Sequence, residues 1–251
     1  MFDNILSVEE VSVAYGAKEI VHGVSFNLRR GEILAIVGES GSGKSTILKA
    51  INGLGGVVTD GQIFFDGREI TNLDDNSRRK ISGESIGMIF QNAGASFCPV
   101  RKIGAQIFES VAAHKNWTYA EFESRAGVIM KNINLDAKIL NEYPFKLSGG
   151  MAQRAGILAA TILNPKLLLA DEPTSALDTI TQVSVVKELL KLRERQNISI
   201  VIVTHHIGVA AYMADKILVL RDGRQIEFGT KEQIFKAPQE IYTRELIKAA
   251  A

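Results

Sequence analysis

The chain has 251 residues, of which 46% are hydrophobic and 23% are charged, and its net charge is +1. This composition excludes a disordered chain, and a charge so close to zero gives no indication of a nucleic-acid-binding surface. The single cysteine, Cys98, excludes an internal disulfide and is typical of a reducing compartment. The sequence has no apolar run of about 18 residues and no signal-peptide pattern, so we expect a cytosolic protein.

Two kinds of strand are predicted in the first third of the chain. Residues 6–16 and 61–70 alternate apolar and polar side chains, which predicts a small antiparallel sheet near the N-terminus. Residues 32–38 form a short apolar run ending in glycine, which is typical of a buried parallel strand before a tight turn. The basic run Arg-Arg-Lys at 78–80 is interpreted as a solvated helix face.

The sequence GESGSGKST, which follows the apolar strand and precedes a predicted helix at 46–53, fits the P-loop pattern G-x-x-x-x-G-K-[ST]. Glycines let backbone N–H groups curl around phosphate oxygens, and the helix N-terminus adds its positive end. Lys44 is expected to contact the β- and γ-phosphates, and the Ser45 hydroxyl to bind Mg²⁺. The residues predicted to bind the nucleotide here are Gly38, Glu39, Ser40, Gly41, Ser42, Gly43, Lys44, Ser45 and Thr46.

The middle of the chain, about 92–154, lacks predicted strands and is interpreted as a helical subdomain inserted into an α/β core. That core comprises 1–91 and 155–251, within a single domain. The helical part contains LSGGMAQR at 147–154, where Ser148 and two glycines could hold an anion at a helix N-terminus. The alternative is a plain serine N-cap with glycines that allow close packing.

The remaining sequence predicts a parallel sheet. Residues 166–173 and 198–205 each carry an apolar run with polar residues at its C-terminal end, and the segment 182–196 between them has one apolar helical face. A strand, a crossover helix and a strand imply parallel pairing, with ligands beyond the carboxyl ends of the strands. Residues 216–229 read as a hairpin that turns at Asp222-Gly223.

Polar residues follow these strands at the edge expected to bind ligand. Asp171 and Glu172 could form a helix N-cap; beside a P-loop we expect Asp171 to hold Mg²⁺ through water and Glu172 to polarise the attacking water. Gln91 could contact Mg²⁺ or that water. His205 ends a strand predicted to lie beside the P-loop strand, which places its ring near the γ-phosphate, whereas His206 is expected to point the other way. The alternative for His205 is a structural role.

The P-loop, Gln91, LSGGM, LLLADEP, SALD and His205 occur in an order that resembles the ATP-binding cassette (ABC) family across nearly the whole chain. The resemblance implies an ATPase that uses ATP and Mg²⁺, with a P-loop core, a mostly parallel sheet, an antiparallel subdomain and a helical subdomain. It also implies head-to-tail pairing of two cassettes, each completing the other's ATP site. The residues expected to reach the partner's ATP are Ser148, Gly149, Gly150, Met151 and Asp178. Tyr15 matches the family's adenine-stacking aromatic; the alternative is a stray aromatic at a strand end.

Met151 and the tail IFKAPQEIYTREL resemble the branch that serves peptide and nickel importers, and the short chain resembles the nickel-type subunit. The resemblance implies a second, different cassette, two membrane-spanning permease subunits, an extracellular or periplasmic substrate-binding protein, no nucleic acid, and a place at the cytoplasmic face of the membrane. The loop after Gln91 would pass nucleotide-driven motion to the permeases.

Two other functions remain open. One is a soluble ABC ATPase that acts on ribosomes or DNA. The other is a P-loop kinase for a small molecule, in which the LSGG motif would have no role. Three positions depart from the family pattern: His206 replaces an aspartate, Asn92-Ala93 stands where a proline is common, and Cys98-Pro99 replaces Asn-Pro. The last two departures lie in the part expected to face the membrane subunits.

Overall fold

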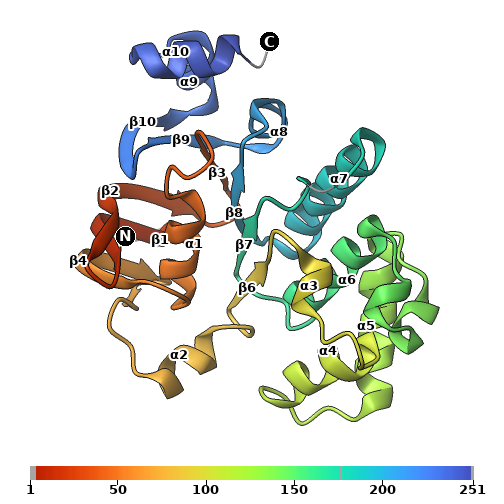
Figure 1. Ribbon diagram of the computed structural model, residues 1–251. Helices are drawn as coiled ribbons and strands as arrows, with labels where there is room; N and C mark the ends of the chain where they lie inside the picture. Colours follow the sequence, from red (N-terminus) through yellow and green to blue (C-terminus); the bar gives the residue numbers. More distant parts are fainter. Residues whose placement is uncertain (1–3, 176, 250–251) are drawn as a thin grey trace.

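A computed structural model describes residues 4–175 and 177–249, in which the strands form two sheets (Figure 1). The N-terminal sheet is antiparallel, in the order β2-β1-β4-β5, as the alternating sequence predicts. Its strands are β1 (Asn4–Tyr15), β2 (Lys18–Arg29), β4 (Val57–Phe65) and β5 (Arg68–Glu69). Register shifts between β1 and both of its neighbours bend this sheet.

The second sheet is mostly parallel and has the order β10-β9-β3-β8-β7-β6. Its strands are β3 (Ile33–Val37), β6 (Ile86–Ile89), β7 (Leu167–Asp171), β8 (Ser199–Thr204), β9 (Lys216–Arg221) and β10 (Arg224–Thr230). Every residue of β3, β7 and β8 is buried, because a parallel sheet is covered on both faces. The predicted parallel pairing of the P-loop strand β3 with β8 is confirmed, and so is the antiparallel β9–β10 hairpin at Asp222-Gly223.

The helices of the described chain fall into two groups. Those around the sheets are α1 (Lys44–Asn52), α2 (Asp75–Ile81), α7 (Thr179–Gln196), α8 (Ile207–Met213), α9 (Lys231–Lys236) and α10 (Ile241–Lys248). Those in the middle of the chain are α3 (Ala93–Ser96), α4 (Ile103–Ala112), α5 (Tyr119–Asn132), short 3-10 turns at Ala137–Asn141 and Pro144–Lys146, and α6 (Gly149–Thr161). This second group lies beyond β6, opposite the antiparallel sheet (Figure 1). The expected boundary at 154 falls inside α6, whose N-terminal half lies among these helices.

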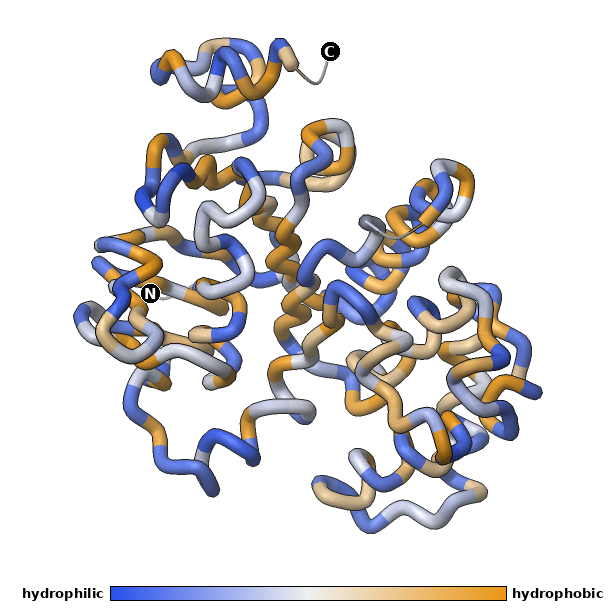
Figure 2. Tube along the Cα trace, viewed as in Figure 1, coloured by the Kyte–Doolittle hydropathy of each residue, from blue (hydrophilic) through white to orange (hydrophobic). Residues whose placement is uncertain are grey.

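The hydrophobic core is divided by the parallel sheet, because alternate side chains of each strand point to opposite faces. Leu34 and Ile36 of β3 pack with α1 and the antiparallel sheet, whereas Ile33, Ala35 and Val37 pack with helices that include α7 and α8. Figure 2 shows hydrophobic residues concentrated along these central strands. Each buried aliphatic side chain of this kind contributes about 1.5–3 kcal/mol. No helix among the described residues is both long and apolar enough to cross a bilayer.

The basic run at 78–80 is not simply a solvated face. Arg79 and Lys80 are exposed, but Arg78 is half-buried and its guanidinium donates to the backbone carbonyls of Ile51 and Ile70. Burial lowers the pKa of Arg78. Arg78 therefore satisfies one carbonyl group at the end of α1 and one just after β5, a role that depends on tertiary packing and leaves no local sequence signal.

Candidate functional site

The loop between β3 and α1 has the conformation that its glycines allow. Gly41 and Gly43 have φ angles of +83° and +95°, in the left-handed region where a side chain is strained. A Cβ atom at Gly38 would overlap the carbonyl oxygen of Leu220 in β9. The chain then enters α1 at Lys44. The loop therefore presents backbone N–H groups and a helix N-terminus at the carboxyl edge of the sheet, which is a phosphate-binding arrangement.

Lys44 is buried at the centre of this loop. Its ammonium group donates to the carbonyl oxygens of Gly38 and Glu39, at 2.9 and 2.7 Å. Burial lowers the pKa of Lys44, whereas the carboxylates of Glu172, Asp171 and Glu39 raise it. The ammonium group of Lys44 thus supplies a positive charge at the centre of the loop, where a polyphosphate could bind.

Ser45 and Asp171 meet across the sheet edge. The Ser45 hydroxyl donates to Asp171 Oδ1 at 2.6 Å, and Asp171 ends β7 with only 4% of its surface exposed. Burial is the main cause that raises the pKa of Asp171, and the Ser45 hydrogen bond opposes it.

These donors suit a magnesium ion. A hydroxyl and a carboxylate supply hard oxygen ligands. Gln91, whose amide nitrogen donates to the neighbouring Glu172, carries a further amide oxygen. The described residues include no group of three His, Cys, Asp or Glu side chains arranged to hold a metal. Mg²⁺ commonly takes one or two protein ligands and completes its shell with water and substrate phosphates.

Glu172 lies between Gln91 and His205, which follow the two strands that neighbour β7, namely β6 and β8. One carboxylate oxygen accepts a 3.0 Å hydrogen bond from the Gln91 amide nitrogen, and the other lies 3.3 Å from His205 Nδ1. Glu172 has a φ angle of +43°, an unfavourable conformation for a residue with a side chain. Its backbone N–H donates to Val203 on β8, which holds the residue in place. Strained residues of this kind are concentrated at functional sites.

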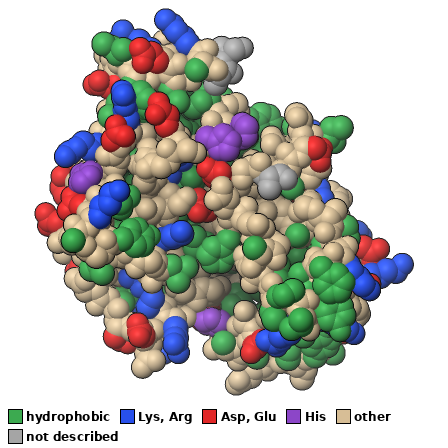
Figure 3. Space-filling model, in the orientation of Figure 1, with side chains coloured by type: hydrophobic (Ala, Val, Ile, Leu, Met, Phe, Trp, Pro, Cys, Tyr) green, Lys and Arg blue, Asp and Glu red, His purple; other side chains and the backbone are tan. Residues whose placement is uncertain are grey.

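The expectation for His206 is wrong. Strand β8 ends at Thr204, so the alternation of a strand does not continue through His205 and His206. His206 instead takes the N-cap position of α8, and the two imidazole rings lie with centroids 4.2 Å apart. Figure 3 shows histidine and acidic side chains gathered together near the middle of this face.

The LSGG segment forms the start of α6, as predicted for a helix N-terminus. Ser148 is the N-cap and accepts a hydrogen bond from the Met151 backbone N–H at 3.3 Å. A Cβ atom at Gly150 would lie 2.9 Å from Thr181 Cγ2, so glycine allows α6 to approach the start of α7. The N-cap role and the close-packing role are therefore both present. Ser148 and Gly149 are nevertheless exposed to solvent.

Asp178, in the SALD stretch, caps the neighbouring helix α7. Its carboxylate accepts hydrogen bonds from the backbone N–H groups of Ile180 and Thr181. Residue 176 of this stretch lies outside the described residues. Within the described part of the chain, no hydrogen bond or ion pair joins 148–151 or Asp178 to the P-loop. The fold does not bring these two groups of predicted residues together in one chain.

Tyr15 ends β1 and keeps 42% of its surface exposed. Its ring lies beside the glycine pair at 55–56, where a Cβ on Gly55 would come within 2.7 Å of the tyrosine hydroxyl. The glycines therefore leave room for the ring, part of which remains exposed to solvent.

Other contacts of the P-loop were not foreseen. The backbone N–H of Gly223, in the β9–β10 turn, donates to the Ser42 carbonyl at 3.1 Å, and Gly223 accepts from the His22 backbone N–H. The dipeptide Asp222-Gly223 signals a turn in the sequence, but nothing local indicates that the turn packs against the phosphate-binding loop.

The β3–loop–α1 unit, with acids at the end of β7, defines a P-loop nucleoside triphosphatase. The protein-family model for the ABC transporter matches residues 21–175 of this chain. The oligopeptide transport ATP-binding protein OppD of Lactococcus lactis subsp. cremoris is 37% identical over 256 residues, covering 98% of this chain and 76% of the relative. The metal-staphylopine import system ATP-binding protein CntD of Staphylococcus aureus is 36% identical over 251 residues, covering 97% and 92%.

A solved structure supports the same assignment. An ATP-binding cassette in a dimeric, post-hydrolysis state bound to ADP and phosphate matches with a TM-score of 0.81 and 31% identity, covering 90% of this chain and 98% of that one. The chain belongs to the ABC transporter family, and it is an ATPase of that family.

Proposed function

We propose that this ATPase powers an importer of small peptides or of a metal chelate such as a nickel complex. The observation that carries the proposal is the cluster in which Glu172 is held between Gln91 and His205 beside the P-loop lysine. Relatives named for oligopeptide and metal-staphylopine transport, which align over nearly the whole of this chain, support the two substrate classes.

The P-loop residues 38–46 bind the phosphates of ATP, and the accessible ring of Tyr15 stacks on adenine. Ser45 and Asp171 would hold Mg²⁺, the latter through water, and the Gln91 amide would contact the ion or the attacking water. When bound, the ion would supply positive charge that offsets the negative charge of the phosphates. Glu172 polarises the attacking water, and His205 holds Glu172 and binds a γ-phosphate oxygen.

The second half of each ATP site comes from another cassette. The exposed N-terminus of α6 supports this assignment, because Ser148 and Gly149 present a hydroxyl and backbone N–H groups to solvent and not to their own P-loop. Gly150, Met151 and Asp178 complete the surface that closes on the partner's nucleotide. The dimeric state of the similar solved cassette supports the pairing. We propose a heterodimer with a different cassette.

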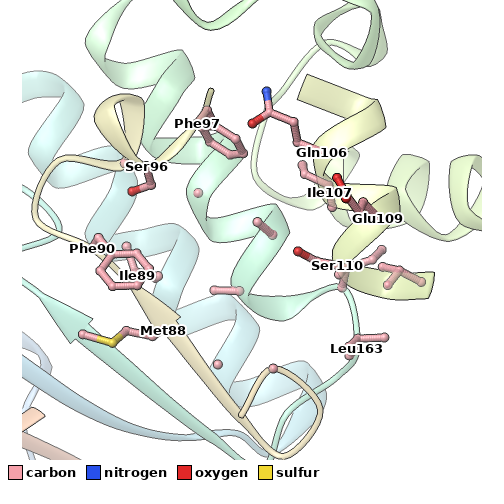
Figure 4. Close-up of a pocket in the computed structure, with 18 of the residues that line it drawn as sticks. Met88, Ile89, Phe90, Ser96, Phe97, Gln106, Ile107, Glu109, Ser110 and Leu163 are labelled. Atoms are coloured by element: carbon pink, nitrogen blue, oxygen red, sulfur yellow. The ribbon is translucent and has the colours of Figure 1, made fainter. Parts of the chain in front are cut away.

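The permease subunits dock on a groove beyond β6. This groove has a volume of about 500 Å³ and lies between the end of β6 and α4, with Phe90, Phe97, Gln106, Glu109, Ser110 and Leu163 among the residues that line it (Figure 4). Phe90 immediately precedes Gln91, so movement of Gln91 at the nucleotide is transmitted to the groove wall. Residues 1–251 act as one domain at the cytoplasmic face of the membrane, and a substrate-binding protein outside the cell delivers the cargo.

Affinity purification of the tagged chain from membranes tests this function. Two permease proteins and a second cassette should co-purify, and a deletion strain should lose growth when nickel or peptide is limiting. Ribosomes or DNA in place of permeases would favour a soluble ABC ATPase. A phosphorylated small molecule produced by the chain alone would favour a kinase. Either result would contradict the importer.

A further inference from the structure

Helix α6, which begins with the LSGG segment, packs along helix α7, which begins after the SALD stretch (Figure 1). In the first turn of α6, a Cβ atom on Gly150 would lie 2.9 Å from Thr181 Cγ2 of α7. One turn further along α6, Arg154 donates to Ser184 and to Glu188 of α7. The contacts advance in the same direction along both helices. The two helices are therefore parallel, and their N-termini lie side by side.

Glu188 is the buried centre of the contact between these helices, with 1% of its surface exposed. Arg154 Nε lies 3.1 and 3.2 Å from its two carboxylate oxygens, and Arg154 Nη2 donates to the Ser184 hydroxyl at 3.0 Å. The Ser184 hydroxyl in turn donates to the carboxylate at 3.0 Å, and the Asn134 amide, which follows α5, donates at 3.4 Å. A buried ion pair with several hydrogen bonds has one favoured geometry, so this pair fixes α6 against α7.

The first turn of α6 has little burial of its own to hold it. Ser148 and Gly149 are exposed, and the first buried residue of the helix is Ala152. The N-terminus of each helix carries a partial positive charge, and two such ends side by side repel each other. Asp178 offsets the charge at the end of α7, where its carboxylate accepts from the Thr181 hydroxyl at 2.6 Å. The end of α6 therefore needs an attractive contact with α7, and the buried ion pair supplies it.

We propose that Arg154 and Glu188 are positioning residues, which hold the LSGG end of α6 and the Asp178 end of α7 together as one surface for the partner's ATP. The inference rests on the proposed division of each ATP site between two cassettes, and it adds residues that do not touch the nucleotide. Arg154 lies about 9 Å along the axis of α6 from Ser148, so a tilt of the helix at this point displaces Ser148 from the phosphates. A displacement of about 1 Å lowers a reaction rate by up to about 10²-fold.

The test begins with Arg154→Lys, which keeps the positive charge but loses the forked pair of Nε and Nη2 donors. In the complex purified from membranes with the partner cassette, kcat for ATP hydrolysis should fall by about tenfold to a hundredfold. The dissociation constant of the monomer for a fluorescent ATP analogue should stay within about twofold, because the substitution leaves the P-loop of its own chain unchanged.

Arg193→Lys is the matched control, because it removes the same kind of forked contact near the other end of α7. Arg193 Nη2 lies 3.0 Å from Asp215, and its Nε donates to the Gly31 carbonyl at 2.6 Å. Arg193→Lys should lower Tm as Arg154→Lys does, but kcat should stay within about twofold. The comparison separates positioning of the LSGG segment from a loss of stability alone.

A double-mutant cycle tests whether the two residues act as a pair. In a Glu188→Gln background, Arg154→Lys should lower kcat by less than about twofold, because the ion pair is already lost. An unchanged kcat in Arg154→Lys, an equal loss in Arg193→Lys, weaker ATP binding by the Arg154→Lys monomer, or independent effects in the double variant would overturn the inference. Ser148→Arg tests the divided site separately. If the complex with this substitution hydrolyses ATP at the normal rate, the proposed contact with the partner's ATP is wrong, a failure distinct from that of Arg154 and Glu188.

Discussion

The amide nitrogen of Gln91 donates a 3.0 Å hydrogen bond to Glu172, although 81 positions separate the two residues in the chain. Gln91 follows β6 and Glu172 follows β7, and these strands are parallel neighbours, so both side chains emerge at one edge of the sheet. His205 approaches the other carboxylate oxygen from the end of β8. Two neighbouring strands thus fix the orientation of one carboxylate, which is the requirement for a group that positions water.

Glu172→Gln is expected to stop turnover and to leave ATP binding intact. The amide has nearly the same shape but cannot polarise water as a carboxylate does, so kcat should fall by about 10²–10⁴-fold. The nucleotide should then persist and stabilise the closed dimer. Phosphate release and size-exclusion chromatography with ATP measure the two effects, with the exposed Glu194→Gln as control. Normal turnover in Glu172→Gln would show that Glu172 does not polarise the attacking water.

Ser148→Arg is expected to abolish hydrolysis without weakening ATP binding by the monomer. The larger side chain fills the N-terminus of α6, which faces solvent in the single chain and would close on the partner's ATP. Equilibrium binding at concentrations where the chain is monomeric, together with ATPase assays at high concentration, separates the two quantities. Loss of ATP binding by the monomer would mean that the LSGG segment contacts the ATP that is bound by its own chain.

The metal-free chain is expected to lose part of its stability as pH rises above about 4 because of Asp171. Burial raises the pKa of this carboxyl, so the native state binds its proton more tightly than the unfolded state does. The contribution of Asp171 to stability is therefore complete below the unfolded-state pKa and is lost as pH rises through the folded-state pKa. Urea denaturation at several pH values measures this slope. Asp171→Asn should lack the part of the pH dependence of stability that comes from Asp171. Identical slopes of unfolding free energy against pH in the two proteins would contradict the assignment of that dependence to Asp171.

Glu188→Ala is expected to lower the free energy of unfolding by about 3–5 kcal/mol. Glu188 of α7 is 1% exposed and accepts from Arg154 Nε of α6 at 3.1 and 3.2 Å and from the Ser184 hydroxyl at 3.0 Å. Its removal leaves the Arg154 charge without its buried partner. Glu194→Ala, on the exposed side of α7, should change stability by less than about 0.5 kcal/mol. Equal effects of the two substitutions would contradict a structural role for this ion pair.

The sequence alone predicts the strands and turns that depend on residues close together in the chain. The apolar run before Gly38 predicts β3, the apolar runs that end at Asp171 and His205 predict the parallel neighbours, and Asp222-Gly223 predicts the hairpin. Topology then places the strand-end residues at one edge, which is why the grouping of Glu172, Gln91 and His205 could be anticipated.

The features that sequence reasoning missed depend on packing between distant segments. Arg78 binds carbonyl groups of two other segments, and Gly223 contacts the P-loop from the distant β9–β10 hairpin. His206 was misjudged for a local reason, since β8 ends one residue before the histidine pair and the strand alternation stops there.

The proposed ATPase function depends on each ATP site being formed by two polypeptides. The direct test is the ATPase rate per chain over a dilution series in which the dimer fraction is measured in parallel by mass photometry. We predict that the rate per chain falls in proportion to the dimer fraction and that adding the partner cassette restores it. A rate per chain that stays constant down to fully monomeric protein would contradict the account.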